Sequence, residues 1–216
     1  MTAIDRGAQA PFGARPKPAL IHPLIVRITH WINAAAIIVM IASGWAIHNA
    51  YPTLPFLFPS SVTLGGSLSG GLQWHFAAMW LLMANGLVYL AYGLASGRFQ
   101  RKLLPIRPVE VIAALRAALA GHLGHADLSV YNAVQRLLYL GVILAGILVV
   151  VSGLSIWKPV QLRWLVMLLG DFDAARLIHF AAMSAIVPFL VVHVAMALLV
   201  PKSLRAMITG RGDTEA

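Results

Sequence analysis

The sequence predicts an all-α protein: an integral membrane four-helix bundle with both termini in the cytoplasm. Three observations predict this fold. Of the 216 residues, 60% are hydrophobic and only 11% are charged, whereas a soluble domain carries about 25% charged residues. Charge-free windows cover residues 28–97, 137–157 and 177–201, and most Lys and Arg lie on one side of them. This composition excludes an ordinary soluble enzyme and a disordered chain.

The N-terminal half is expected to hold an arm and two spans. Residues 1–23 contain charges but no apolar run, so we expect a cytoplasmic arm and not a cleavable signal peptide. The long window over residues 28–97 is interrupted by residues 51–71, which are rich in Pro, Gly and Ser, as loops are. We therefore expect spans at about residues 24–47 and 72–95.

The C-terminal half is expected to hold two further spans, at about residues 137–157 and 177–201. Each has about 20 residues, enough to cross roughly 30 Å of hydrocarbon as a helix. Before them, residues 108–120 place apolar side chains on one stripe. This pattern predicts a short cytoplasmic surface helix between spans two and three; a helix packed on the loops is the alternative. The transmembrane domain thus covers residues 24–201.

The distribution of Lys and Arg predicts the orientation. Thirteen of the sixteen lie in the arm, in the connection between spans two and three, and in the tail after residue 201. The positive-inside rule places that side in the cytoplasm, so residues 202–216 form a cytoplasmic tail. The net charge of +9 follows from this orientation, and lipid is the expected partner instead of nucleic acid. No internal repeat is expected beyond the four spans.

Four of the eight histidines lie within the spans or at their ends: His30, His75, His179 and His193. Ionisable residues in membrane helices are costly and are functional candidates. Because the spans alternate in direction, His30 and His193 lie toward the cytoplasm and His75 and His179 toward the outside. His179 and His193 are 14 residues apart, which puts them near one helix face and about 21 Å apart. The sequence predicts two stacked sites.

A pair of imidazoles from opposite helices is the axial ligand set of a low-spin b-type haem, which transfers electrons. The chain has no cysteine, which excludes iron–sulfur clusters, thiolate zinc sites and covalent haem attachment. The spans hold no carboxylate, which disfavours zinc and proton transport. Glycines in the spans would admit a flat macrocycle, and they are equally typical of helix packing. We expect two haem b groups.

The remaining polar candidates are weaker. Arg27, Arg136 and Arg176 lie at the mouths of the spans, where they either anchor the helices at the interface or pair with haem propionates. The other histidines are expected at span ends or in loops: His22, His48, His122 and His125.

The His30-Trp31 pair, His75 and the spaced histidines His179 and His193 resemble the bacterial cytochrome b561 superfamily. This group includes the cytochrome b subunits of nickel–iron hydrogenases and of formate dehydrogenase. The resemblance covers about residues 20–205. It implies that His30 and His193 ligate an inner haem, and that His75 and His179 ligate an outer haem.

A second stretch, from Tyr131 to Arg136, is similar to the Asn-Ala-Gly-Gln-Lys stretch of formate dehydrogenase cytochrome subunits. There the Asn and Gly help to bind menaquinone, and the resemblance implies a quinone site at Asn132. Val134 stands where that family has glycine. From the residues alone, Asn132 is a helix N-cap or a turn residue.

The leading hypothesis is a di-haem cytochrome of the bacterial cytoplasmic membrane. It would pass electrons between the quinone pool and a partner oxidoreductase at the outer loops, as a subunit more than as an independent enzyme. The resemblance includes relatives that accompany molybdopterin-dependent enzymes. The alternative is a stand-alone superoxide:quinone oxidoreductase, for which Lys158, Arg163 and Arg176 would attract the anion. A haem-free bundle is the third hypothesis. Asp173 lies in the outer loop expected to dock the partner, and it could equally be the N-cap of the fourth span.

Overall fold

The fold is described from a computed structural model, which covers residues 20–120 and 131–211. Within these residues, four helices are long and apolar enough to cross a membrane, as the sequence predicted. They are α1 (Leu24–Ala50), α2 (Leu68–Ala95), α5 (Ala133–Trp157) and α7 (Phe172–Leu199). The shorter helices are η1 (Ser60–Val62), α3 (Arg98–Leu103), α4 (Pro108–Leu119), α6 (Arg163–Leu168) and α8 (Pro201–Thr209).

Three of the four long helices begin four or five residues before the starts expected from the charge-free windows. The reason is that each begins at a polar N-cap, which satisfies backbone N–H groups that the first turn leaves unpaired. Ser67 caps α2, accepting from Gly70 N at 3.1 Å, and Asn132 caps α5. The expected starts followed instead the end of the glycine-rich loop for α2, and the first arginine after the cap for α5 and α7.

The cap of α7 is Asp171, whose Oδ1 accepts a hydrogen bond from Ala174 N at 2.7 Å. The expectation of Asp173 as the N-cap was therefore wrong. Asp173 lies in the first turn and forms an ion pair with Arg176 at 3.6 Å. Because Asp171 precedes the first helical residue and is extended, its carboxylate can reach back to the free N–H groups.

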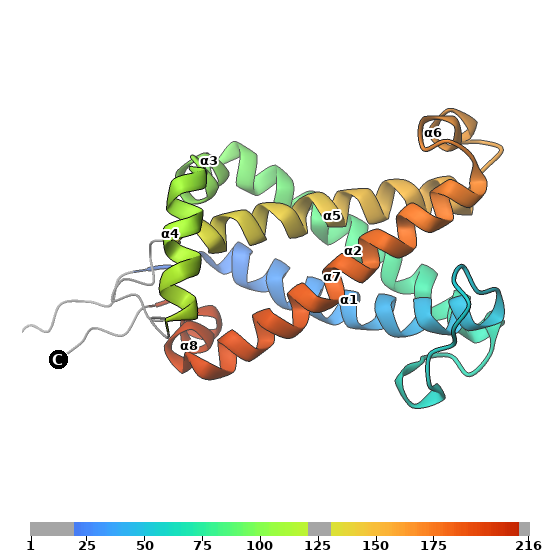
Figure 1. Ribbon diagram of the computed structural model, residues 1–216, viewed down its shortest axis with the longest axis horizontal. Helices are drawn as coiled ribbons and strands as arrows, with labels where there is room; N and C mark the ends of the chain where they lie inside the picture. The colour runs from blue at the N-terminus through green and yellow to red at the C-terminus, as the bar shows by residue number, and fades with distance from the viewer. Residues whose placement is uncertain (1–19, 121–130, 212–216) are drawn as a thin grey trace, which may run out of the picture.

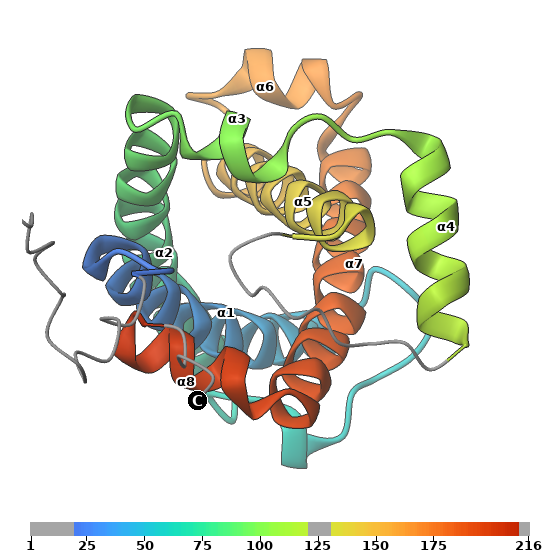
Figure 2. The same cartoon turned by 90° about the vertical axis from the view of Figure 1, so that its left-hand side faces the viewer.

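The spans form two hairpins. Helix α1 packs along α2, and α5 packs along α7 (Figures 1 and 2). Inside the second hairpin, Val149 of α5 and Ala182 and Ile186 of α7 form a buried apolar cluster. Ile37 of α1 packs against this cluster from the first hairpin. The two hairpins thus meet along α7, which is where two of the candidate histidines lie.

The ends of the bundle differ. At one end, which we call the loop end, lie η1 and α6 (Figure 1). At the other, which we call the terminal end, lie α3, α4 and α8, with α4 running across the spans (Figure 1). Its Val109 and Ile112 side chains are exposed. The described part of the chain does not include residues 1–19, residues 212–216 of the expected tail, or His122 and His125.

Both ends of the described chain meet at the terminal end. Leu20 and Arg211 form an isolated antiparallel bridge, and Ile21 N and His22 N both donate to Gly210 O, at 2.9 and 3.1 Å. Gly210 ends α8 with a φ of 83°, a conformation that favours glycine. The chain therefore enters and leaves the bundle on the same side, as an even number of spans requires.

Candidate functional site

The four candidate histidines form two pairs in the structure. The rings of His30 on α1 and His193 on α7 have their centroids 5.9 Å apart. The rings of His75 on α2 and His179 on α7 have their centroids 6.3 Å apart. Each pair joins one helix of the first hairpin to α7 of the second. The structure therefore brings together the partners that depth in the membrane had matched.

These separations fit two imidazoles on opposite sides of one metal ion. A metal–imidazole bond is about 2 Å long and the ring centre lies roughly 1 Å beyond the nitrogen, which puts the two centroids about 6 Å apart. Among the described residues, no three His, Cys, Asp or Glu side chains are grouped so that they could hold a metal. Two nitrogen ligands suit a haem iron, because the porphyrin supplies the other four.

The surroundings of the His75–His179 pair are apolar, as the faces of a macrocycle require. A cavity borders both rings and is lined by side chains of all four spans. Its apolar lining includes Ile37, Met40, Leu82, Val149, Met183 and Ile186. A ring system that is apolar except at its edge would displace no hydrogen-bonded water from such a lining.

Both rings of this pair are held through Nδ1. Ser43 Oγ lies 3.1 Å from His75 Nδ1, and Ser152 Oγ lies 3.2 Å from His179 Nδ1. Each serine belongs to the other helix of the same hairpin. Because Nδ1 is occupied, Nε2 is the nitrogen left to bind a metal. Sequence analysis missed both serines, since an isolated serine in an apolar span gives no sign of what it faces.

The surroundings of the His30–His193 pair are mainly aromatic. The His193 ring stacks on Phe189 with centroids 5.6 Å apart and an interplanar angle of 12°. Trp31 lies edge-on to His30 at 5.2 Å. Aromatic contacts of this kind restrict ring orientation without using the ring nitrogens.

An amide pair ties α1 to α2 next to the His30 level. Asn85 Nδ2 donates to Thr29 O and to Asn33 Oδ1, both at 2.7 Å. Thr29 and Asn33 flank His30 on α1, so this contact helps to set the position of its backbone. The sequence contained a sign of this contact, because Asn33 and Asn85 are polar residues in otherwise apolar windows.

The arginines at the span mouths bind backbone carbonyls. Arg136 donates to Tyr131 O at 2.9 Å and to Pro105 O at 3.1 Å. Arg176 donates to Tyr51 O at 2.9 Å and lies over the Tyr51 ring at 4.4 Å. Arg27 donates to a carbonyl of α8, that of Ile208. These contacts join loops and helix ends, and a role toward haem propionates stays a prediction.

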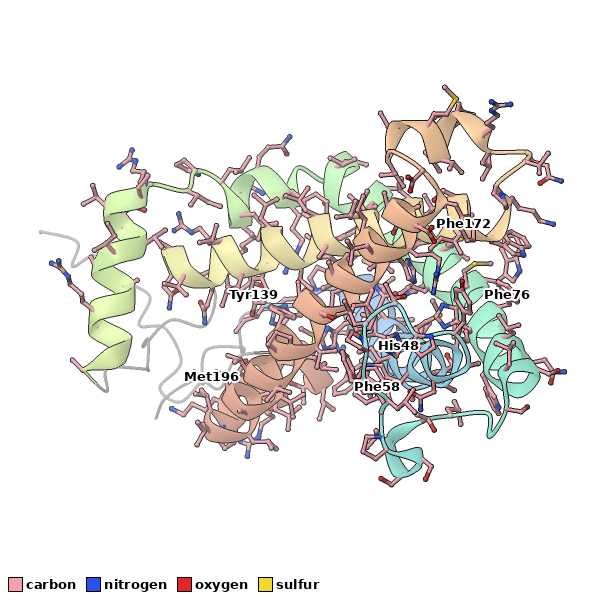
Figure 3. All side chains as sticks on the ribbon, turned by 45° about the vertical axis from the view of Figure 1, so that its right-hand side comes forward. His48, Phe58, Phe76, Tyr139, Phe172 and Met196 are labelled. Atoms are coloured by element: carbon pink, nitrogen blue, oxygen red, sulfur yellow. The ribbon has the colours of Figure 1, made fainter. Side chains whose placement is uncertain are left out.

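His48 has a structural role at the loop end. It is buried, its Nδ1 accepts from Thr53 N at 3.3 Å, and its Nε2 lies 3.1 Å from Phe56 O. The ring also contacts Phe58 and Phe180, at 5.4 and 4.9 Å between centroids. Figure 3 shows His48 and Phe58 together at this end of the bundle. With both ring nitrogens used by the loop backbone, His48 holds the loop between α1 and α2 on α1.

Asn132 uses its side chain in a capping box. Its Oδ1 accepts from Gln135 N at 2.8 Å, and its own N donates to Gln135 Oε1 at 3.0 Å. The preceding Tyr131 packs against Tyr139 with ring centroids 5.1 Å apart. The N-cap interpretation of Asn132 thus has direct support, and a contact with quinone stays a prediction.

Comparison with known proteins supports the resemblance drawn from the histidines. A family model described as prokaryotic cytochrome b561 matches residues 21–210. The chain belongs to this family. The cytochrome is 52% identical over 190 residues to a protein of Azospira oryzae named putative protein-methionine-sulfoxide reductase subunit YedZ1. That match covers 88% of this chain and 96% of the relative.

A more distant relative is named a probable Ni/Fe-hydrogenase B-type cytochrome subunit, from Cupriavidus necator. It is 28% identical over 216 residues, covering 91% of this chain and 85% of the relative. Membership of the family, together with the four apolar helices, makes this cytochrome a multi-pass membrane protein of haem-based electron transfer.

Proposed function

We propose that this cytochrome b561 holds two haem b groups and carries electrons between the quinone pool and a partner oxidoreductase. His75 and His179 would ligate one haem, and His30 and His193 the other. The observation that supports this most is the pair of ring separations, 6.3 and 5.9 Å, each across the two hairpins. A haem with two axial histidines exchanges single electrons and has no open position for oxygen.

Helix α7 gives the two sites a common support. It supplies one ligand to each pair, and the 14 residues between them correspond to a rise of about 21 Å. The hydrogen bonds of Asn85 to Thr29 and Asn33 position the α1 backbone around His30. Ser43 and Ser152 position the rings of the other histidine pair. The spans are apolar, so a charge moving between the two sites would cross a medium of low dielectric constant.

The loop end is proposed to lie outside the bacterial cytoplasmic membrane, because most Lys and Arg lie at the terminal end. Helix α6 and the turn before it carry exposed apolar side chains there, namely Val160, Trp164, Met167 and Leu168. These side chains and the η1 loop form the proposed docking surface for the partner. Because the relative at 52% identity is named as a subunit of a protein-methionine-sulfoxide reductase, we propose a partner of that activity, of the molybdopterin-dependent type.

Quinone is proposed to bind at the terminal end, beside the inner histidine pair. The support is the similarity around Asn132, together with the side chains that surround it. Tyr131 and Tyr139 are half-buried, and Arg98 hydrogen-bonds Tyr131. Phenol and guanidinium groups are donors that suit the carbonyl oxygens of a quinone.

Two of the three cations invoked for the superoxide alternative are engaged with neighbouring groups, and the third, Arg163, is exposed. Arg176 is engaged with Asp173, Tyr51 and Thr53. Lys158 lies over the Trp157 ring at 4.7 Å. A cationic group that is held by its neighbours in this way attracts a free anion less strongly than a solvated one does.

The proposed function is tested with the purified cytochrome in lipid nanodiscs. Addition of quinol should produce the absorption bands of reduced b-type haem. Subsequent addition of the partner reductase with methionine sulfoxide should reoxidise the haem, and omission of either should not. Absence of a Soret band, or haem that quinol cannot reduce, would contradict the proposal. Rapid reduction by superoxide without any partner would favour the stand-alone enzyme.

A further inference from the structure

Two helices from different hairpins share a short sequence repeat. Residues 38–47 of α1 read Ile-Val-Met-Ile-Ala-Ser-Gly-Trp-Ala-Ile, and residues 147–156 of α5 read Ile-Leu-Val-Val-Val-Ser-Gly-Leu-Ser-Ile. The two segments share four identical residues of ten, with the Ser-Gly step at the same place. The repeat is short and mostly apolar. Its Ser-Gly centre becomes informative only in the structure, where both serines contact a histidine of the His75–His179 pair.

The two serines contact the two histidines of the His75–His179 pair in the same way. Ser43 Oγ donates to Val39 O, and Ser152 Oγ donates to Leu148 O, both at 2.6 Å and both four residues earlier in the helix. A hydroxyl has a single hydrogen, so each oxygen is left with lone pairs toward the imidazole. Each serine therefore accepts a hydrogen bond from Nδ1–H.

A backbone carbonyl provides a second acceptor for each ring. Val149 O lies 3.0 Å from His179 Nδ1, and the backbone of Met40 hydrogen-bonds the His75 ring. Each carbonyl belongs to the residue three before the serine of the same repeat. Because a carbonyl oxygen can only accept, Nδ1 of His179 carries the proton, and the serine contact gives Nδ1 of His75 the same role. Both Nε2 atoms therefore present a lone pair.

The glycines of the repeat let the rings come this close. A Cβ added at Gly44 would lie 3.5 Å from His75 Cε1, and one added at Gly153 would lie 3.1 Å from His179 Cε1. Ser43 and Ser152 are themselves fully buried, with 0% exposure. Water therefore cannot replace either hydroxyl as an acceptor.

The other histidine pair lacks this support. Within residues 20–120 and 131–211, no side-chain hydrogen bond to His30 or His193 accompanies their aromatic contacts. A second hydrogen-bond partner orients a metal-bound imidazole and raises its basicity. The two pairs thus differ in the feature that sets how strongly an imidazole donates electrons to a metal.

We infer that Ser43 and Ser152 are positioning residues that act through His75 and His179 and hold the reduction potential of the outer haem down. The inference rests on the proposed function, since it needs a haem between these rings. The more basic the two imidazoles are, the more they stabilise the ferric over the ferrous state. Removal of the hydroxyls should therefore raise the potential of this haem alone.

The test is a spectroscopic redox titration of the full-length cytochrome in nanodiscs, with haem quantified per chain. Ser43→Ala and Ser152→Ala should each shift one midpoint upward, the double variant should shift it further, and the second midpoint should stay unchanged. Ser43→Thr and Ser152→Thr, which keep a hydroxyl, should return the midpoint toward the wild-type value. The electron paramagnetic resonance signal of the same haem should change with it.

Ser155→Ala is the matched control. Ser155 is also fully buried on α5, and its hydroxyl donates to Ser152 O at 2.7 Å without touching a histidine. Unchanged midpoints in the alanine variants, or an equal shift in Ser155→Ala, would overturn the inference. Loss of the outer haem from both the alanine and the threonine variants would also overturn it, because the site would then depend on side-chain size. A wild-type protein with fewer than two haems would instead contradict the proposed function.

Discussion

His22 is a buried imidazole among cationic side chains at the terminal end, where sequence analysis expected an interfacial residue. Its exposure is 7%, and Arg98 Nη2 lies 3.4 Å from its Nδ1. Burial, and then the charge of Arg98, lower the pKa of His22 from 6.5 to about 4, with smaller contributions from His30, Lys102 and Arg27. The imidazole is therefore neutral at physiological pH and accepts from the guanidinium.

This environment predicts how stability depends on pH. Because the pKa of His22 is lower in the folded state, the unfolded chain binds the extra proton. The contribution of His22 to stability is complete above about pH 6.5 and is lost as the pH falls toward 4. Melting of the Soret band should show a steeper loss of thermal stability between pH 7 and 5 in the wild type than in His22→Gln. Equal slopes for the two proteins would contradict this account.

The sequence identifies the four candidate ligands but not the groups that hold them. His30, His75, His179 and His193 stood out because an ionisable side chain in a charge-free window needs a reason to be there. Serine has no such cost in a membrane helix, since its hydroxyl bonds the preceding turn. The partners of the ring nitrogens depend on how α1 and α5 face α2 and α7, which a single sequence does not specify.

Asn132, at the N-terminus of α5, has two proposed roles: it caps the helix, and it binds quinone. Two substitutions of this residue distinguish these roles. Asn132→Ala removes the cap and should lower the free energy of unfolding by about 1 kcal/mol. Asn132→Ser keeps a capping oxygen and should retain the stability of the wild type. Thermal melting of both variants, followed by circular dichroism, measures this difference.

Quinol-dependent reduction of haem in the same two variants tests the second role. If Asn132 only caps α5, Asn132→Ser should be reduced by quinol as fast as the wild type. A slower reaction in Asn132→Ser at unchanged stability would place the amide group in quinone binding. Equal stability of Asn132→Ala and the wild type would contradict the capping role.

The helix ends show what a hydropathy pattern can give. The apolar windows predicted four long helices in the right order; the start of α1 agreed, and the other three helices begin four or five residues earlier than expected. Arg136 and Arg176 end the charge-free windows, yet both lie one turn inside their helices, where their long side chains reach the loops. The polar residues before them, Asn132 and Asp171, were the better signal, because a helix begins where its first N–H groups find an acceptor.

On the scale of the whole molecule, the two hairpins explain why the histidines pair as they do. The closest backbone packing lies within the hairpins, α1 with α2 and α5 with α7. Each histidine pair instead spans the two hairpins, with α7 common to both. The direction of the spans and the positions of His179 and His193 predicted the levels of these pairs. The separation of the rings depends on tertiary packing and came only from the structure.

Four histidines are proposed to form two independent haem sites, and α7 supplies one ligand to each site. Haem content per chain, measured as pyridine haemochrome in the wild type and in the four single His→Ala variants, tests this claim most directly. The wild type should hold two haems and each variant one. His75→Ala and His179→Ala should retain the same haem by its midpoint potential, and His30→Ala and His193→Ala the other. One haem in the wild type, or variants that group in any other way, would contradict the claim.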